Sequence, residues 1–140
     1  MNAIRLAASL FILVLIGVSA MGWVWTGTHQ PPAQALAGRT VLALARLRSA
    51  KQIVLLHYSP IRQTVEGEPL EIYPYVGSSR LEEPISRFPV SLVVHGHAHR
   101  GRHEGRTKND VPVYNVSLPL LQRTFPGRQP FLVLEVAVDA

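Results

Sequence analysis

The sequence predicts a mixed α/β domain behind an apolar N-terminal helix. Residues 6–25 contain no charged side chain, whereas residues 33–50 combine an apolar face with scattered arginines. Two short apolar, β-branched runs come next, at residues 52–57 and 90–95, and such runs are typical of buried strands. With 140 residues, 47% of them hydrophobic, the chain is long enough for one domain with a core and too short for two.

The apolar tract of residues 6–25 has the length a helix needs to cross the hydrocarbon core of a membrane. Arg5 precedes it, and this charge bias places the N-terminus in the cytoplasm and exports the rest of the chain. The tract is either a membrane anchor or a signal peptide cleaved after Ala20; a buried core helix is a third possibility. We therefore expect residues 1–25 as signal or anchor, a Pro-containing linker at 26–32 and a domain at 33–138. The protein is then membrane-anchored or exported, or cytoplasmic if the tract is an artefact of the reading frame.

The central part of the chain alternates helical and strand patterns. Residues 33–50 predict an amphipathic helix, uninterrupted or restarting after Gly38. Residues 52–57 predict a buried strand, and residues 58–78 predict a long loop. A short helix comes after the loop, beginning at Ser79 with capping-box spacing or at Pro84.

The last third predicts three more strands. Residues 90–95 form the first, and a basic turn from Arg100 to Lys108 comes after it. Residues 111–118 and 131–138 are the other two apolar, β-branched runs. No internal repeat or low-complexity tract interrupts this order.

Composition excludes several kinds of site. The absence of cysteine excludes disulfides, a thiolate nucleophile and cysteine-ligated metals, so any metal must have nitrogen or oxygen ligands. The net charge is +5, and 12 of the 14 basic residues are arginine, which suits forked contacts with phosphate or carboxylate. Nothing in the sequence indicates a specific nucleic-acid site. The arginines of the basic turn and Arg80 are either solvated or in contact with an anionic substrate, and Arg100 is the candidate substrate-binding residue.

Four of the six histidines lie where apolar strands end. His57 ends the first strand, His95 ends the second, and His97 and His99 come after Gly96, whose missing side chain permits a sharp turn. Two imidazoles at positions i and i+2 of extended backbone project to the same side, where their nitrogens bind Mn, Fe or Zn. An isolated H-x-H is also common in ordinary polar loops. Here the glycine and the two histidine-terminated strands favour a divalent transition metal site.

Four segments together resemble the C-terminal half of the calcineurin-like metallophosphoesterases. They are HYSP at 57–60, EIYPYVGSSRLEEPI at 71–85, HGHAH at 95–99 and PVYNVSLP at 112–119. The resemblance implies part of a four-layer αββα sandwich and hydrolysis of phosphate mono- or diesters. It also implies that His57 and His97 ligate one metal and His99 the other. His95 is not a ligand in that family, and we interpret it as a residue that supports the ligands from behind or as a packed strand residue.

The family's carboxylate-bearing motifs are missing from this sequence. D-x-H, G-D-x-x-D and G-N-H-[DE] do not occur, the first acidic residue is Glu66, and the only asparagine in residues 1–65 is Asn2. Without a bridging carboxylate, two cations about 3.5–4 Å apart repel each other, so a two-metal site in one chain is not expected. We therefore assign no catalytic residue and expect reduced metal occupancy and impaired or absent hydrolysis. The alternatives are a non-catalytic single-metal or anion-binding module, a half-domain completed by a partner chain that supplies the missing ligands, or a gene fragment without independent function.

Overall fold

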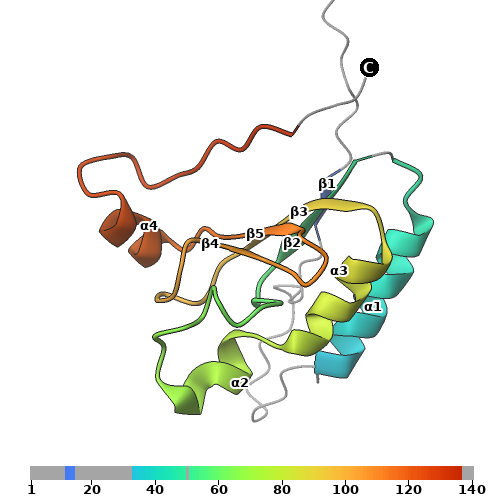
Figure 1. Ribbon diagram of the computed structural model, residues 1–140, viewed down its shortest axis with the longest axis horizontal. Helices are drawn as coiled ribbons and strands as arrows, with labels where there is room; N and C mark the ends of the chain where they lie inside the picture. Colours follow the sequence, from blue (N-terminus) through green and yellow to red (C-terminus); the bar gives the residue numbers. More distant parts are fainter. Residues whose placement is uncertain (1–11, 15–32, 50, 137–140) are drawn as a thin grey trace, which may run out of the picture.

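The computed structural model describes residues 12–14, 33–49 and 51–136, and it confirms the mixed α/β class (Figure 1). Within these residues the strands form a single sheet with the spatial order β1-β2-β3-β5-β4. β1, β2, β3 and β5 run parallel, and β4 is antiparallel to β5 at the sheet edge. The strands are β1 (Ile12–Val14), β2 (Gln52–Leu56), β3 (Val90–His95), β4 (Glu104–Arg106) and β5 (Pro112–Asn115).

One face of the sheet is covered by helices α1 (Ala33–Arg46) and α3 (Glu82–Arg87), which lie side by side in Figure 1. Buried side chains alternate along β2 and β5, as expected where one sheet face packs against helices. Leu44 of α1 and Ile85 of α3 pack on Val54 and Val93 of the central strands, and all four are almost fully buried. This core fixes the two central strands, whose ends carry the histidines.

The predicted helix at 33–50 and strand at 52–57 are largely confirmed. α1 is uninterrupted through Gly38, so the first of the two alternatives is confirmed, and the helix ends four residues earlier than predicted. β2 ends at Leu56, which places His57 just beyond the strand. The predicted strand at residues 90–95 matches β3.

The segment at 58–78 is not the unbroken loop that the sequence predicts. It contains a 3-10 turn at Leu70–Ile72 and the short helix α2 (Tyr73–Val76). The next helix starts as a 3-10 turn at Ser79–Leu81, with Ser78 accepting a hydrogen bond from the Arg80 N–H, and continues as α3. Pro84 lies in the first turn of α3, where the missing N–H has no intrahelical partner to lose, so it does not break the helix.

The C-terminal third departs furthest from the expectation. The basic turn contains strand β4, and the predicted strand at 111–118 is shortened because helix α4 (Leu118–Thr124) begins at its end. Leu120 and Leu121 bury the apolar side of α4. The predicted strand at 131–138 is wrong over its described part, since residues 131–136 pair with no strand there. A strand needs a neighbour as well as a β-rich sequence.

The apolar tract of residues 6–25 lies outside the described residues except for β1. At Ile12–Val14 the chain is a strand parallel to β2, so the predicted apolar helix is wrong at these three positions. None of the helices in the described ranges is long and apolar enough to cross a membrane.

Candidate functional site

The sheet brings His57 and the turn at residues 95–99 to one edge. β2 and β3 are parallel neighbours, and Leu56 is in register with His95. Because parallel strands end at the same edge, the residue after β2 and the residues after β3 lie next to each other. The sequence prediction that the two strand-terminal histidine segments meet is therefore confirmed for His57 and His97.

His57, Tyr58 and His97 form a cluster of three rings at this edge. The imidazoles of His57 and His97 are 4.5 Å apart between ring centroids with an interplanar angle of 34°. The Tyr58 ring stands edge-on to both, with centroids 4.7 Å from His57 and 5.5 Å from His97. Tyr58 is half-buried and packs against the main core, so it supports the two exposed imidazoles from below.

His97, and not Gly96, makes the sharp turn. His97 has a φ of 65°, and the Ala98 N–H donates to the Gly96 carbonyl at 2.8 Å, which closes a three-residue turn around His97. A side chain at position 96 would meet no atom within 4 Å, so the structural role assigned to Gly96 is wrong. A positive φ at a histidine costs free energy and is common at functional sites.

The turn also separates His97 from His99. The expectation that both imidazoles project to one side assumed extended backbone, and the left-handed conformation of His97 removes that condition. His99 makes no ring contact with His57 or His97. Among the described residues, no three His, Asp or Glu side chains are grouped closely enough to hold a metal ion.

Glu68 holds the backbone of His99 from the opposite loop. Its Oε1 accepts hydrogen bonds from the N–H groups of His99 and Arg100, at 2.6 and 2.7 Å. Arg123 of α4 donates to the His99 carbonyl at 2.7 Å. The position of His99 is thus set by one acidic and one basic side chain, and the sequence reasoning assigned a role to neither.

His95 lies below the turn, in a buried polar network. Its side chain is fully buried, its Nδ1 is 2.9 Å from the Gly96 carbonyl, and its Nε2 is 2.8 Å from the Thr64 hydroxyl. Since a carbonyl only accepts, Nδ1 carries the proton and Nε2 accepts from Thr64. Thr64 in turn hydrogen-bonds the buried Ser59 hydroxyl at 2.7 Å. His95 is therefore a packed strand residue that contacts Thr64 and makes no ring contact with His57 or His97.

Asn115 at the end of β5 completes this buried polar network. Its amide nitrogen donates to the carbonyls of Thr64 and Ala98, at 3.0 and 2.9 Å, and its oxygen accepts from the Ser117 N–H. The Ser117 hydroxyl donates to the same Ala98 carbonyl. These hydrogen bonds join three segments that are distant in the sequence.

Gly101 lies so close to the loop at residues 61–65 that no side chain would fit between them. Gly101 has a φ of 95°, and a Cβ there would lie 2.6 Å from the carbonyl carbon and oxygen of Thr64. The Arg102 N–H donates to the Gln63 carbonyl at 3.2 Å. Glycine is required at position 101 because of both the positive φ and the close approach.

Burial favours the uncharged forms of His57, Tyr58 and His95. Partial burial lowers the pKa of His57, and the adjacent His97 lowers it further. Burial raises the pKa of Tyr58. Burial lowers the pKa of His95 to about 4, although the hydrogen bond to the Gly96 carbonyl opposes the shift. A neutral imidazole at His57 is the form that binds a metal ion.

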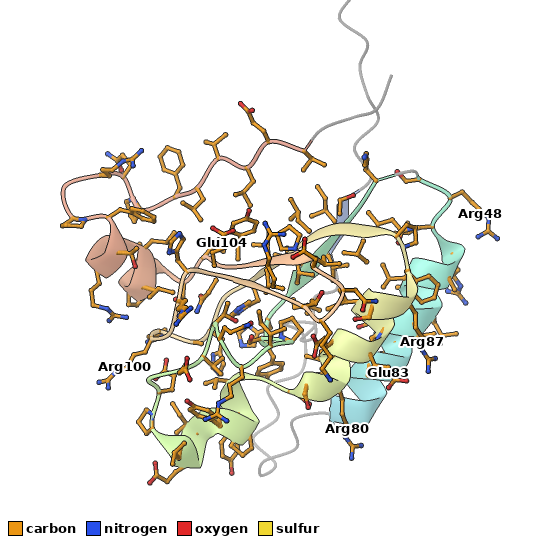
Figure 2. The ribbon with its side chains drawn as sticks, in the orientation of Figure 1. Arg48, Arg80, Glu83, Arg87, Arg100 and Glu104 are labelled. Atoms are coloured by element: carbon orange, nitrogen blue, oxygen red, sulfur yellow. The ribbon has the colours of Figure 1, made fainter. Side chains whose placement is uncertain are left out.

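The arginines labelled in Figure 2 lie on different sides of the molecule. Arg80 and Arg87 lie on the helical side of the molecule, and Arg100 points outward on the opposite side (Figure 2). Arg87 pairs with Glu83, and Arg106 pairs with Asp110. The assignment of Arg100 to substrate binding stays a prediction, because only its backbone N–H has a described partner.

The donor set at the ring cluster consists of the imidazoles of His57 and His97, and it lacks the carboxylate that a two-metal centre needs. Imidazole nitrogens are ligands that suit transition metals such as Zn and Fe. No carboxylate from the described residues joins them, and Glu68 is engaged with backbone N–H groups. Comparison with models of protein families, with curated proteins and with solved structures found no match to this chain.

Proposed function

We propose that this chain is a metallophosphoesterase-like half-domain that binds one divalent transition metal ion at its surface. The contact of the His57 and His97 rings where β2 and β3 end carries the proposal. The proposed ligands are the imidazoles of His57 and His97, whereas His99, which the resemblance assigns to the other metal, is not grouped with them. The partial αββα sandwich belongs to the same proposal. When bound, the metal supplies Lewis acidity toward a phosphate oxygen.

The spacing of the two rings supports shared ligation. In tetrahedral sites a metal–nitrogen distance of about 2.0–2.1 Å places two ligand nitrogens roughly 3.3 Å apart. The ring centroids of His57 and His97 are 4.5 Å apart, a separation of the same order as that between two ligand nitrogens. Tyr58 packs against both rings and restricts where they move, which reduces the conformational entropy lost on binding.

Metal binding by the full chain should depend on both rings of the pair. We expect zinc binding in calorimetry, and we expect His57→Ala and His97→Ala each to weaken it by more than about tenfold, since loss of even an outer-shell partner typically costs about 10- to 100-fold. His103→Ala is the matched control, because His103 packs on Phe125 away from the pair. Binding that both variants leave undiminished places the metal elsewhere and ends the proposal.

The isolated chain should not hydrolyse a generic aryl phosphodiester with added manganese. Turnover in the two-metal mechanism requires ions that clamp the attacking and leaving oxygens, and the described residues at the ring cluster lack the carboxylate that bridges them. The family's general acid, which typically contributes about 10²–10⁴-fold, lies in motifs that this sequence does not contain. Manganese-dependent turnover that disappears in His97→Ala would contradict the prediction and assign the chain as an enzyme.

A further inference from the structure

Residues 131–136 form an extended apolar segment, and its backbone is unpaired from Leu132 onward, because the Phe131 N–H donates to the Gln129 carbonyl at 2.9 Å. The sequence is FLVLEV, which has the composition of a strand. Across the described part of the chain, no hydrogen bond involves the backbone of residues 132–136. Such a row of free N–H and C=O groups is a template for pairing with another strand.

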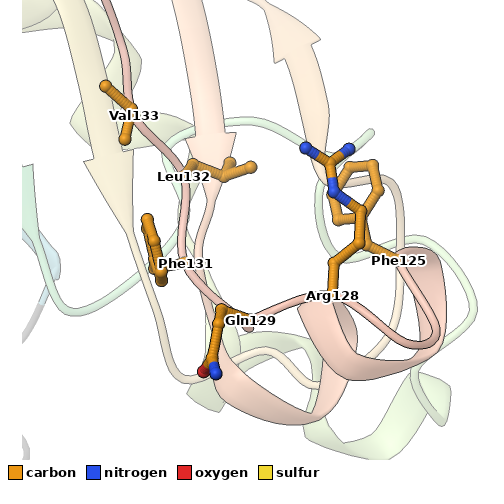
Figure 3. Close-up of a pocket in the computed structure, with 6 residues that line it drawn as sticks. All are labelled: Phe125, Arg128, Gln129, Phe131, Leu132 and Val133. Carbon is orange, nitrogen blue, oxygen red and sulfur yellow. The ribbon is translucent and has the colours of Figure 1, made fainter.

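The segment exposes one apolar side. Phe131 is 64% exposed and Val133 is 80% exposed, whereas Leu132 and Leu134 are half-buried. Figure 3 shows Phe131 and Val133 on one side of the backbone and Leu132 on the other. The alternation is that of a strand with one face against its own molecule and one face open.

The side chains of the segment are complementary to a second copy in antiparallel orientation. Pairing about a twofold axis centred on Leu132 places Phe131 opposite Val133 twice, and aromatic pairs with β-branched residues are favourable. It also places Glu135, the only charged residue of the segment, at the same end of the pair as the turn at Gln129, whose side-chain amide is able to donate to a carboxylate.

Other ways of pairing two copies are less favourable. Centring on Val133 places Phe131 opposite Glu135, and centring on Leu134 places Val133 opposite Glu135. In-register parallel pairing places the two Glu135 carboxylates side by side, which is destabilising. Pro130 lies at the end of the Leu132-centred pair, where its missing N–H costs least.

We propose that residues 131–133 pair antiparallel with the same segment of a second copy of this chain, with Leu132 opposite Leu132. A two-stranded contact of this length is weak by itself, so the dimer forms and dissociates with concentration. The pairing gives the free backbone groups partners and covers Phe131 and Val133.

The absence of cysteine from the chain permits a test that is specific for the register. In the full chain, purified in mild detergent, Leu132→Cys should oxidise to a covalent dimer, because opposed Cα atoms lie about 4.5–5.5 Å apart, within disulfide range. Leu134→Cys is the matched control. Its two copies lie four positions apart along the pair, about 13 Å, and should form several-fold less dimer.

A second substitution separates strand pairing from chance association. Val133→Lys added to Leu132→Cys should suppress the covalent dimer. Lysine replaces the apolar partner of Phe131, and a charged side chain on an exposed strand disfavours pairing with another chain. Leu70→Lys, at a side chain that is 72% exposed elsewhere, should leave the dimer unchanged. Equal cross-linking at positions 132 and 134, more at 134 than at 132, or none at either overturns the proposal. Circular dichroism establishes that each variant is folded.

Discussion

Replacing Asn115 with leucine should lower the free energy of unfolding by about 3–5 kcal/mol, because each buried polar group left without a partner costs about 1–3 kcal/mol. Asn115 is fully buried and makes three hydrogen bonds to backbone groups. Leucine has the same branching and number of side-chain heavy atoms, but it leaves the Thr64 carbonyl and the Ser117 N–H without their described partner. Urea unfolding of the full chain in mild detergent, followed by circular dichroism, measures the change.

Asn109 supplies the matched control for this substitution. Its side-chain amide donates to the Ser86 carbonyl at 3.0 Å from an exposed position, where water replaces a lost partner. Asn109→Ala should therefore cost less than about 1 kcal/mol. An Asn115→Leu variant as stable as Asn109→Ala would show that the buried polar network does not hold the turn.

The same substitution has a second expected consequence at the ring cluster. Asn115 and Ser117 both bind the Ala98 carbonyl, one residue from His97. If these bonds keep His97 in its left-handed conformation, Asn115→Leu should weaken zinc binding although residue 115 is buried and is not one of the proposed ligands. Stability and metal affinity are then lost together through one residue that joins β5 to the turn.

The parts of the fold that were predictable are those with a local signal. α1 has a one-sided apolar pattern, and β2 and β3 are continuous β-branched runs, so each could be placed from its own residues. β4 contains only Glu104, Gly105 and Arg106, which have no strand preference, and it forms because β5 offers an edge. Residues 131–136 show the converse, a strong strand sequence without a neighbour.

The candidate site also has one part that the local sequence predicts and another part that depends on contacts between distant residues. That His57 and His97 meet is a consequence of two parallel strands ending together, which the sequence indicates. The hydrogen bond from His95 to Thr64 spans 31 residues and that from Asn115 to Thr64 spans 51, and no periodicity encodes such pairs. The separation of His99 from the ring pair goes with one positive φ at His97, which no local pattern in the sequence indicates.

Protonation of His95 should make the fold markedly less stable in acid. The pKa of His95 in the folded chain is about 4, and an unfolded histidine has a pKa of about 6.5. Because the folded value is the lower one, the stabilisation is fully present above pH 6.5 and is lost as the pH falls toward 4. The difference corresponds to about 3 kcal/mol across this window.

The physical cause is the buried position of the ring. Nδ1 already donates to the Gly96 carbonyl, and Nε2 accepts from Thr64, so a second proton charges a group with no water around it. Urea unfolding between pH 7 and pH 4, in mild detergent with a chelator present, measures the slope. His95→Gln removes the titrating ring and should flatten this part of the profile, whereas His103→Gln, at a half-buried ring beside Phe125, should retain it. A His95→Gln profile as steep as that of the unsubstituted chain would mean that His95 is not the group that titrates.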